Sequence, residues 1–352
     1  MKITTIGALA LSTALATGAA FAEGVEMTVF DWSGYEDQGF FGAYMEKYGE
    51  PPSFTYFGSQ EEAYTKLQSG FTPDLGHQCL ESVKKWVASD LVQPIDTSKL
   101  KNWDALLPEI KAVDGLSVDG ELYMVPFEWG NTGLIYRTDK IADDEISLQL
   151  LADPAYQGRV TINDSALSAY ALAALATGSA ADYTSLSDEQ FEAASDYLRA
   201  IHPNIRFYWS DAGQVDQAMA SGEVDMAWAW NQTELNLIAN ETPAKMMRDV
   251  DKGIATWVCG YMHLKASTVP EEQIYDYLNA ITDTASGKYI IESWGYPHSN
   301  AGSFAISDQD LIMKYGFDDP KKFFEGTLLF NSPEPQVEAK MLKEYERIKA
   351  GF

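Results

Sequence analysis

The chain has 352 residues, of which 46% are hydrophobic, 12% aromatic and 22% charged, and its formal net charge is −27. This length allows two domains with large cores, and the low charged fraction excludes a disordered chain. The negative charge excludes nucleic acid as a partner, because such binding depends on basic side chains that neutralise phosphates.

The first residues have the pattern of an export signal. Lys2 supplies the positive charge, residues 6–18 form a short apolar run, and Ala20-Phe-Ala22 is a small-x-small cleavage site. We therefore expect a signal peptide over residues 1–22, cleavage after Ala22 and a mature protein in the periplasm. The apolar run is too short to span a membrane.

Strand and helix patterns alternate after the signal. Strands are expected at residues 26–31, 53–57 and 74–77, and helices at 40–48, 60–68 and 82–88. This order predicts a parallel sheet covered on both faces, with a ligand edge beyond the carboxyl ends of the strands. Residues 32–35 and 78–81 fall at that edge.

A second alternating region follows. Strands are expected at residues 159–163, 205–209 and 224–230, and helices at 148–151, 166–175, 188–201, 211–220 and 232–240. Ser187 is a candidate N-cap for the helix at 188–201. Further helices are expected at 271–282, 285–293 and 334–349.

Two extended runs separate these regions, at Val125–Arg137 and at Gly253–His263. Both are rich in strand-forming residues, and we interpret them as crossings between two lobes. The predicted fold class is therefore α/β, with two lobes and a ligand cleft between them. The first lobe would comprise residues 23–131 and 259–305, and the second lobe residues 132–258 and 306–352.

Familiar catalytic and metal motifs are missing. The sequence has no nucleotide-binding glycine motif, nucleophile elbow or zinc-protease motif, so we expect no enzyme activity, no cofactor and no metal. His77, His202, His263 and His298 lack metal-ligand spacing and are expected to be surface or satisfied buried residues.

Cys79 and Cys259 are far apart in the sequence. An exported chain of this size does not need disulfides to fold. We therefore expect two unpaired cysteines, and a disulfide is the less favoured alternative.

Aromatic residues recur at the ends of the predicted strands and crossings. They are Trp32, Tyr35, Trp129, Trp230, Trp257 and Tyr296. Each one alone is more often a core residue, but their shared position at the cleft edge favours binding of a cation, which aromatic faces attract. Asp164 ends a predicted strand at the same edge and could neutralise that cation.

Several segments resemble one family. They are Phe30-Asp-Trp-Ser-Gly-Tyr35, Gln93-Pro-Ile-Asp-Thr-Ser-Lys-Leu100, Val125-Pro-Phe-Glu-Trp-Gly-Asn-Thr132, Gly295-Tyr-Pro297 and the final Lys343–Phe352. Their order over nearly the whole mature chain is similar to that of the spermidine/putrescine-binding proteins of bacterial ABC importers. The resemblance implies a type II periplasmic-binding-protein fold with two hinge crossings, and delivery of the ligand to an inner-membrane ABC permease.

The resemblance also implies a set of ligand-binding residues. By position these are Trp32, Ser33, Tyr35, Asp164, Trp230, Trp257, Tyr296 and Asn331. The chain departs from the family at Cys259, where an Asp is usual, at Leu167, where a Glu can stand, and at Glu81, where a Tyr can stand. Glu81 or Glu128 could compensate for the lost acids, although either could also be a solvated or structural carboxylate.

These departures leave the ligand open. The family implies a polyamine such as spermidine or putrescine, whereas fewer acids suit a methylated onium compound such as glycine betaine or dimethylsulfoniopropionate. In either case the partner is a small cation and the protein is expected to be monomeric. The alternatives are an exported carboxylate-dependent hydrolase and a ligand-sensing partner of a membrane receptor. Replacing Trp230 or Asp164 with Ala is expected to weaken binding strongly.

Overall fold

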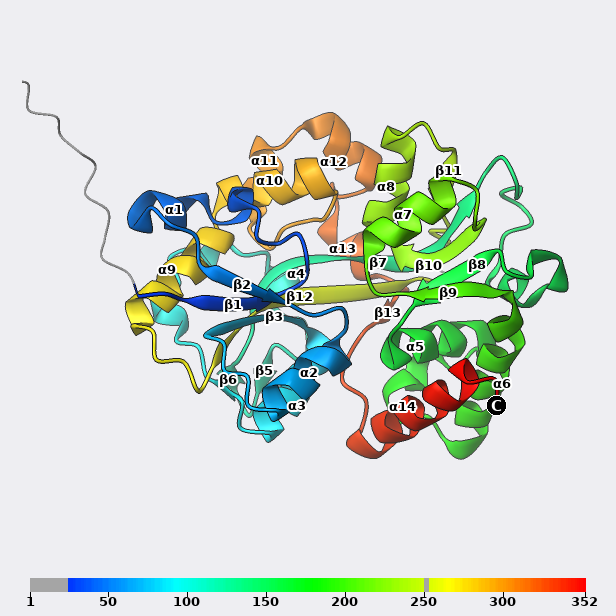
Figure 1. Ribbon diagram of the computed structural model, residues 1–352. Helices are drawn as coiled ribbons and strands as arrows, with labels where there is room; N and C mark the ends of the chain where they lie inside the picture. Colours follow the sequence, from blue (N-terminus) through cyan, green and yellow to red (C-terminus); the bar gives the residue numbers. More distant parts are fainter. Residues whose placement is uncertain (1–24, 250–252) are drawn as a thin grey trace, which may run out of the picture.

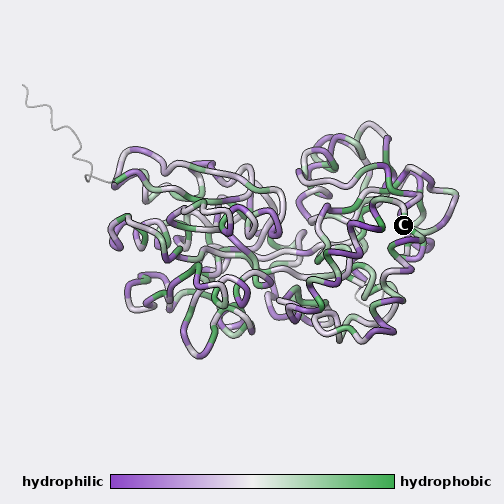
Figure 2. Tube along the Cα trace, turned by 60° about the horizontal axis from the view of Figure 1, so that its bottom comes forward, coloured by the Kyte–Doolittle hydropathy of each residue, from purple (hydrophilic) through white to green (hydrophobic). Residues whose placement is uncertain are grey.

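The computed structural model describes residues 25–249 and 253–352, so the predicted signal peptide lies outside the described part. The chain forms two lobes joined by extended strands (Figure 1). A second view shows a narrow waist between the two bodies (Figure 2). Within the described residues, no helix is long and apolar enough to cross a membrane.

The first lobe contains the predicted parallel sheet. Its strands are β1 (Thr28–Asp31), β2 (Ser53–Tyr56) and β3 (Leu75–Cys79), in the order β2-β1-β3. The connecting helices are α1 (Gly42–Tyr48), α2 (Gln60–Gln68) and α3 (Leu80–Ala88). Helices lie on both faces of this sheet, as the alternation predicted (Figure 1).

The second lobe repeats this arrangement with different residues. Its parallel strands are β8 (Val160–Asn163), β9 (Ile205–Trp209) and β10 (Met226–Trp230), in the order β10-β8-β9. Its helices are α5 (Ala166–Thr177), α6 (Asp188–Ile201), α7 (Ala212–Ala220) and α8 (Asn231–Ala239). Ser187 caps α6 in a capping box with Gln190, which confirms the predicted start of that helix.

The two predicted crossings are the two central strands. β7 spans Val125–Arg137 and β12 spans Ala255–Leu264, and they pair in antiparallel fashion. β12 also pairs with β3, and β7 also pairs with β10. The strand order β2-β1-β3-β12-β7-β10-β8-β9 is therefore continuous from one lobe to the other.

The remaining elements are mostly short. Short strands are β4 (Val92–Gln93), β5 (Ser117–Val118), β6 (Glu121–Leu122), β11 (Ala244–Met246) and β13 (Leu328–Leu329). The other helices are α4 (Pro108–Lys111), α9 (Glu271–Ile281), α10 (Thr284–Trp294), α11 (Ala301–Ile306), α12 (Gln309–Tyr315), α13 (Pro320–Phe324) and α14 (Pro335–Lys349). Single turns of 3-10 helix lie at Gln38–Phe40, Thr97–Lys99, Trp103–Ala105, Pro154–Tyr156 and His202–Asn204, with longer ones at Leu148–Ala152 and Ala180–Ser185.

Four of these helices, α4 and α11 to α13, were missed in the sequence because each has at most seven residues and too few turns for a helical period. The helix expected at residues 148–151 is a 3-10 helix. The closing helix α14 packs against α5 and α6 of the second lobe (Figure 1).

Candidate functional site

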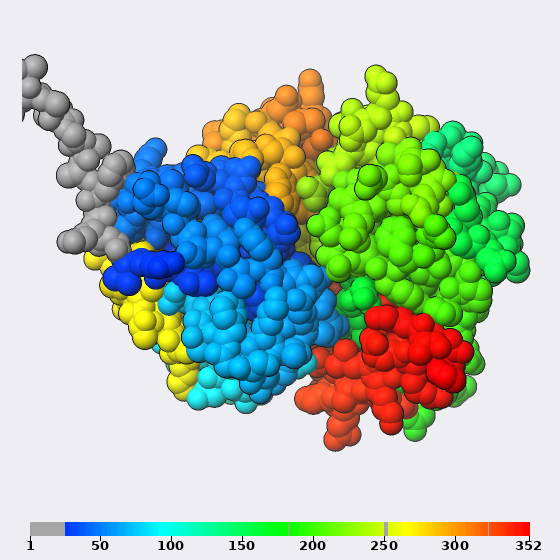
Figure 3. Space-filling view, viewed as in Figure 1, coloured from blue at the N-terminus to red at the C-terminus, as the bar shows by residue number. Residues whose placement is uncertain are grey.

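A cavity of about 370 Å³ lies between the lobes. In Figure 3 the two lobes meet along a narrow crevice. The wall contains residues after β1 and β3 of the first lobe, residues after β8, β9 and β10 of the second, and residues of both central strands. The cavity thus lies beyond the carboxyl ends of the parallel strands, where ligands bind in open α/β sheets.

Nine of the eleven predicted site residues line this cavity. They are Trp32, Ser33, Tyr35, Glu81, Glu128, Trp230, Trp257, Cys259 and Tyr296. They come from six segments that are distant in the sequence, and the fold brings them together.

Asp164 and Asn331 are not in the lining of this cavity. Asn163 and Ser165 face the cavity, whereas Asp164 between them forms an ion pair of 2.7 Å with Lys349 of α14. Neighbouring residues at a strand end point to opposite sides, which explains this result. The Asn331 side chain accepts a hydrogen bond from the backbone N–H of Ser332. Trp129 is also outside the lining, because it packs in the core against Phe304.

Aromatic rings form much of the cavity wall. Trp32 of the first lobe and Trp230 of the second meet edge to face, with ring centroids 6.0 Å apart. Trp257 and Tyr296 make a similar contact at 4.9 Å. Gly130 is the strand partner of Trp257, and a Cβ atom at Gly130 would lie 2.3 Å from the indole. The glycine in the first crossing therefore makes room for an aromatic residue of the second.

The two cysteines form a disulfide, which corrects the expectation of unpaired thiols. Cys79 ends β3 and Cys259 lies directly opposite it on β12. The residues are 180 positions apart in the sequence, but their strands are neighbours in the sheet. Both line the cavity, so the position predicted for ligand contact at Cys259 is occupied by a disulfide sulfur rather than a thiol.

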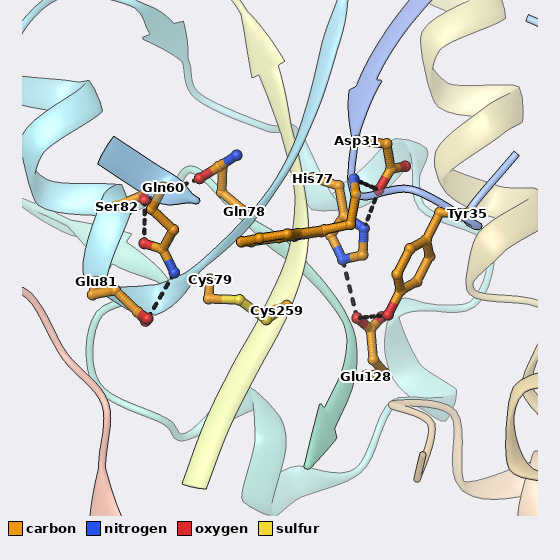
Figure 4. The surroundings of a disulfide bond; sticks show 11 residues. Asp31, Tyr35, Gln60, His77, Gln78, Cys79, Glu81, Ser82, Glu128 and Cys259 are labelled. Carbon is orange, nitrogen blue, oxygen red and sulfur yellow. Dashed lines mark hydrogen bonds and ion pairs between the residues drawn. A yellow bond between two sulfur atoms is a disulfide. The ribbon is translucent and has the colours of Figure 1, made fainter. Parts of the chain in front are cut away.

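Two buried carboxylates lie on either side of the disulfide (Figure 4). Glu81, in the first turn of α3, accepts a hydrogen bond of 2.6 Å from the Gln60 side chain. Its second oxygen has no hydrogen-bond partner among the described residues. Burial raises the pKa of the Glu81 carboxyl to about 7, and the neighbouring Glu61 acts in the same direction.

Glu128, on β7, is held by more partners. Its Oε1 accepts a hydrogen bond of 3.1 Å from the Tyr35 hydroxyl and lies 3.1 Å from Nε2 of His77. Its Oε2 is buried and without a hydrogen-bond partner in the described part of the chain. Burial raises the pKa of Glu128, whereas the charge of His77 and the Tyr35 hydroxyl oppose this rise.

Two further carboxylates of the wall were missed in the sequence. Asp211 caps α7, and Asp216 lies in the same helix and accepts a hydrogen bond of 2.7 Å from Asn236. Burial raises the pKa of Asp216. Over the described ranges, the wall contains four carboxylates and no Lys or Arg. An aromatic wall with this charge favours a positively charged ligand.

His77 is a buried histidine with charged partners, which is one of the two alternatives expected for it. It lies in β3, which is buried along its whole length, and it contacts both Asp31 and Glu128. The signal was present in the pattern, because a polar residue inside a strand with both faces buried must find a partner. No group of three His, Cys, Asp or Glu side chains suited to a metal ion is found within the described residues.

Fold and cavity together define a two-lobed binding protein whose ligand site lies between the lobes. The chain belongs to the bacterial extracellular solute-binding protein family, whose model matches residues 52–314. The protein is therefore a solute-binding protein rather than an enzyme.

Individual relatives agree with this assignment and confirm the resemblance seen in the sequence. The chain is 24% identical over 351 residues to the spermidine/putrescine-binding periplasmic protein of Salmonella typhimurium, covering 98% of this chain and 97% of that protein. It is 21% identical to the putrescine-binding periplasmic protein PotF of Escherichia coli, covering 96% and 95% of the two chains.

A solved structure agrees in fold. The putative spermidine/putrescine ABC transporter protein from Listeria monocytogenes superposes with a TM-score of 0.81 at 19% identity, over 92% of this chain and 98% of that one. This likeness confirms the predicted type II periplasmic-binding-protein fold.

Proposed function

We propose that the protein captures a polyamine in the periplasm and delivers it to the inner-membrane permease of an ABC importer. The observation that carries this proposal is the charge of the cavity wall, which contains four carboxylates and, among the described residues, no basic side chain. The names of the relatives, which refer to spermidine and putrescine, support the same ligand class.

The spacing of the carboxylates favours a polyamine over a single onium group. Glu128 is the strand partner of Cys259, which is the partner of Cys79, and Glu81 follows two residues later. The Cα atoms of Cys79 and Cys259 are 3.8 Å apart. Because neighbouring strands lie about 4.8 Å apart, roughly 9 Å separates the backbones of Glu128 and Cys79. A ligand with ammonium groups at both ends can reach both carboxylates, whereas one onium group can neutralise only one of them.

The chemistry between the carboxylates fits the same ligand. The disulfide offers an uncharged surface between Glu81 and Glu128, and aromatic rings contribute further apolar surface to the wall. Methylene groups between two ammonium groups suit such a surface, because they need no polar partner. A betaine would also bring a carboxylate into a wall where the described residues provide no Lys or Arg.

In this proposal the site comprises the nine predicted residues that line the cavity together with Asp211 and Asp216, and Asp164 and Asn331 have no direct part in it. The lobes, with the boundaries predicted above, would close on the ligand by bending at the two central strands. The mature protein would begin after Ala22 and act as a monomer.

Calorimetric titration of the mature protein, refolded to remove endogenous ligand, tests this function. Putrescine and spermidine are each expected to bind with a micromolar or lower dissociation constant, and glycine betaine and dimethylsulfoniopropionate are expected to give no binding heat. Binding of only the methylated compounds would overturn the polyamine assignment. Recovery of chemically unchanged putrescine after long incubation is expected, and its conversion would instead favour the hydrolase.

A further inference from the structure

A buried polar cluster lies directly behind the cavity wall. It consists of Asp31 at the end of β1, Tyr35 in the following loop, His77 of β3, Glu128 of β7 and Tyr261 of β12. Figure 4 shows the first four of these residues. Each of the five residues has at most 6% of its surface exposed, so none of these polar groups relies on bulk water. Most of their polar atoms therefore pair with one another, whereas Oε2 of Glu128 has no hydrogen-bond partner among the described residues.

His77 is the centre of this cluster. Its Nδ1 lies 2.7 Å from Oδ1 of Asp31, and its Nε2 lies 3.1 Å from Oε1 of Glu128. The ring of Tyr261 stacks on the imidazole with ring centroids 4.4 Å apart, and the ring of Tyr35 meets the imidazole edge to face with centroids 4.6 Å apart. Burial lowers the pKa of His77, but the carboxylates of Glu128 and Asp31 outweigh burial and raise it to about 10.

The cluster reaches the cavity at three points. Asp31 also accepts a hydrogen bond of 2.8 Å from the backbone N–H of Trp32 and one of 2.9 Å from the Tyr261 hydroxyl. Tyr35 donates to Glu128. Trp32, Tyr35 and Glu128 line the cavity, whereas Asp31, His77 and Tyr261 do not.

We propose that His77 is a positioning residue for ligand binding, which acts as a buried imidazolium that holds the Glu128 carboxylate and the Trp32–Tyr35 loop in place at the cavity wall. The imidazolium compensates one of the two buried negative charges behind the wall. The other negative charge is left for a ligand ammonium group, and Glu128 is the carboxylate that presents this charge to the ligand. This inference rests on the proposed function, because it assigns a role within the same site.

A double-mutant cycle tests this role. Putrescine titrations would compare the wild type with His77→Gln, Glu128→Gln and the double variant. We expect a loss of affinity of about tenfold for His77→Gln and about 100-fold for Glu128→Gln, because each removes a charge-assisted contact. The double variant is expected to bind within about twofold of Glu128→Gln, since His77 acts through Glu128.

His263→Gln is the matched control. His263 is buried in β12 of the same sheet and contacts Gln93, away from the cavity wall. Its replacement is expected to leave putrescine affinity unchanged within about twofold. A general weakening of the fold would lower affinity in this control as well.

A spectroscopic measurement separates positioning from a merely structural role. Side-chain ¹⁵N NMR is expected to find both His77 nitrogens protonated at pH 8 in the wild type, and to find that His77 loses its proton at lower pH in Glu128→Gln. The titratable groups that face His77 are Asp31, Tyr35, Glu128 and Tyr261, and of these only Glu128 is changed. If His77→Gln does not fold, Asp31→Asn takes its place in the cycle, with the same coupling to Glu128→Gln expected.

The outcomes are distinct. If the wild type binds no polyamine, the proposed function fails. If the wild type binds putrescine but the losses are additive, or His77 is neutral at pH 8, the role of His77 is overturned and the proposed function stands.

Discussion

The two buried carboxylates of the cavity wall differ in how the protein holds them. Glu128 contacts a charged histidine and a tyrosine hydroxyl, and both belong to a network that spans four strands. Glu81 accepts one hydrogen bond from an uncharged amide, and its pKa is raised to about 7. One end of the cavity therefore has a counter-ion built into the fold, whereas the charge at the other end depends on pH and on the ligand.

The largest expected effect is that of Glu128→Gln. Removing one partner of a desolvated charge pair costs about 2–5 kcal/mol, so putrescine affinity should fall by about 100-fold. Calorimetric titration at pH 8 measures this change. If Glu128→Gln lost less putrescine affinity than Glu81→Gln, Glu81 rather than Glu128 would be the more important carboxylate.

Glu81→Gln is expected to have a smaller effect that depends on pH. At pH 8 the wild-type carboxyl is ionised and its loss should cost about tenfold in affinity, whereas near pH 6 it is already protonated and the loss should shrink.

The wild type should show the same dependence directly. Because a bound ammonium group favours the ionised form of Glu81, putrescine binding should release a proton near pH 7 and weaken as the pH falls below 7. Titrations in buffers of different ionisation enthalpy measure the proton release. If the Glu81→Gln variant keeps the pH dependence of putrescine binding, another titratable group causes that dependence.

Trp230→Leu removes a ring that is not tied to either carboxylate. A cation–π contact contributes about 0.5–2 kcal/mol, so affinity should fall by about fivefold, equally at pH 6 and pH 8. Titration at the two pH values checks this. An effect that appears at one pH only would link Trp230 to the Glu81 end.

Asp164→Asn should have the smallest effect. It removes one negative charge, as Glu128→Gln does, but at an ion pair with Lys349 outside the cavity. We expect putrescine affinity within about twofold of the wild type, because this half-buried ion pair does not face the cavity. A tenfold loss would restore Asp164 to the site and would mean that the lobes close differently when ligand binds.

Local patterns in the sequence were enough for much of this picture. Strand and helix periods predicted the parallel strands of both lobes, and the strand-like composition of Val125–Arg137 predicted the first central strand with its observed bounds. The aromatic residues that follow strands were brought to one edge, because parallel strands share their carboxyl ends.

Pairings between distant strands could not be predicted in this way. Cys79 and Cys259 pair because β3 and β12 are in register, and no local pattern encodes that register. The same applies to His77 and Glu128, which meet across the sheet. The position of Asp164 outside the cavity lining could not be predicted, because the sequence identifies the end of a strand but not the side to which each end residue points.

The central strands have a mechanical consequence. Glu128 and Trp257 lie on the two strands that also join the lobes. A ligand that contacts these residues contacts the connecting strands themselves. Occupancy of the ligand site and the angle between the lobes are therefore thermodynamically coupled. A permease that favours one angle would therefore change the affinity for the ligand. By reciprocity, the free energy of that change would equal the free energy by which the ligand shifts the angle.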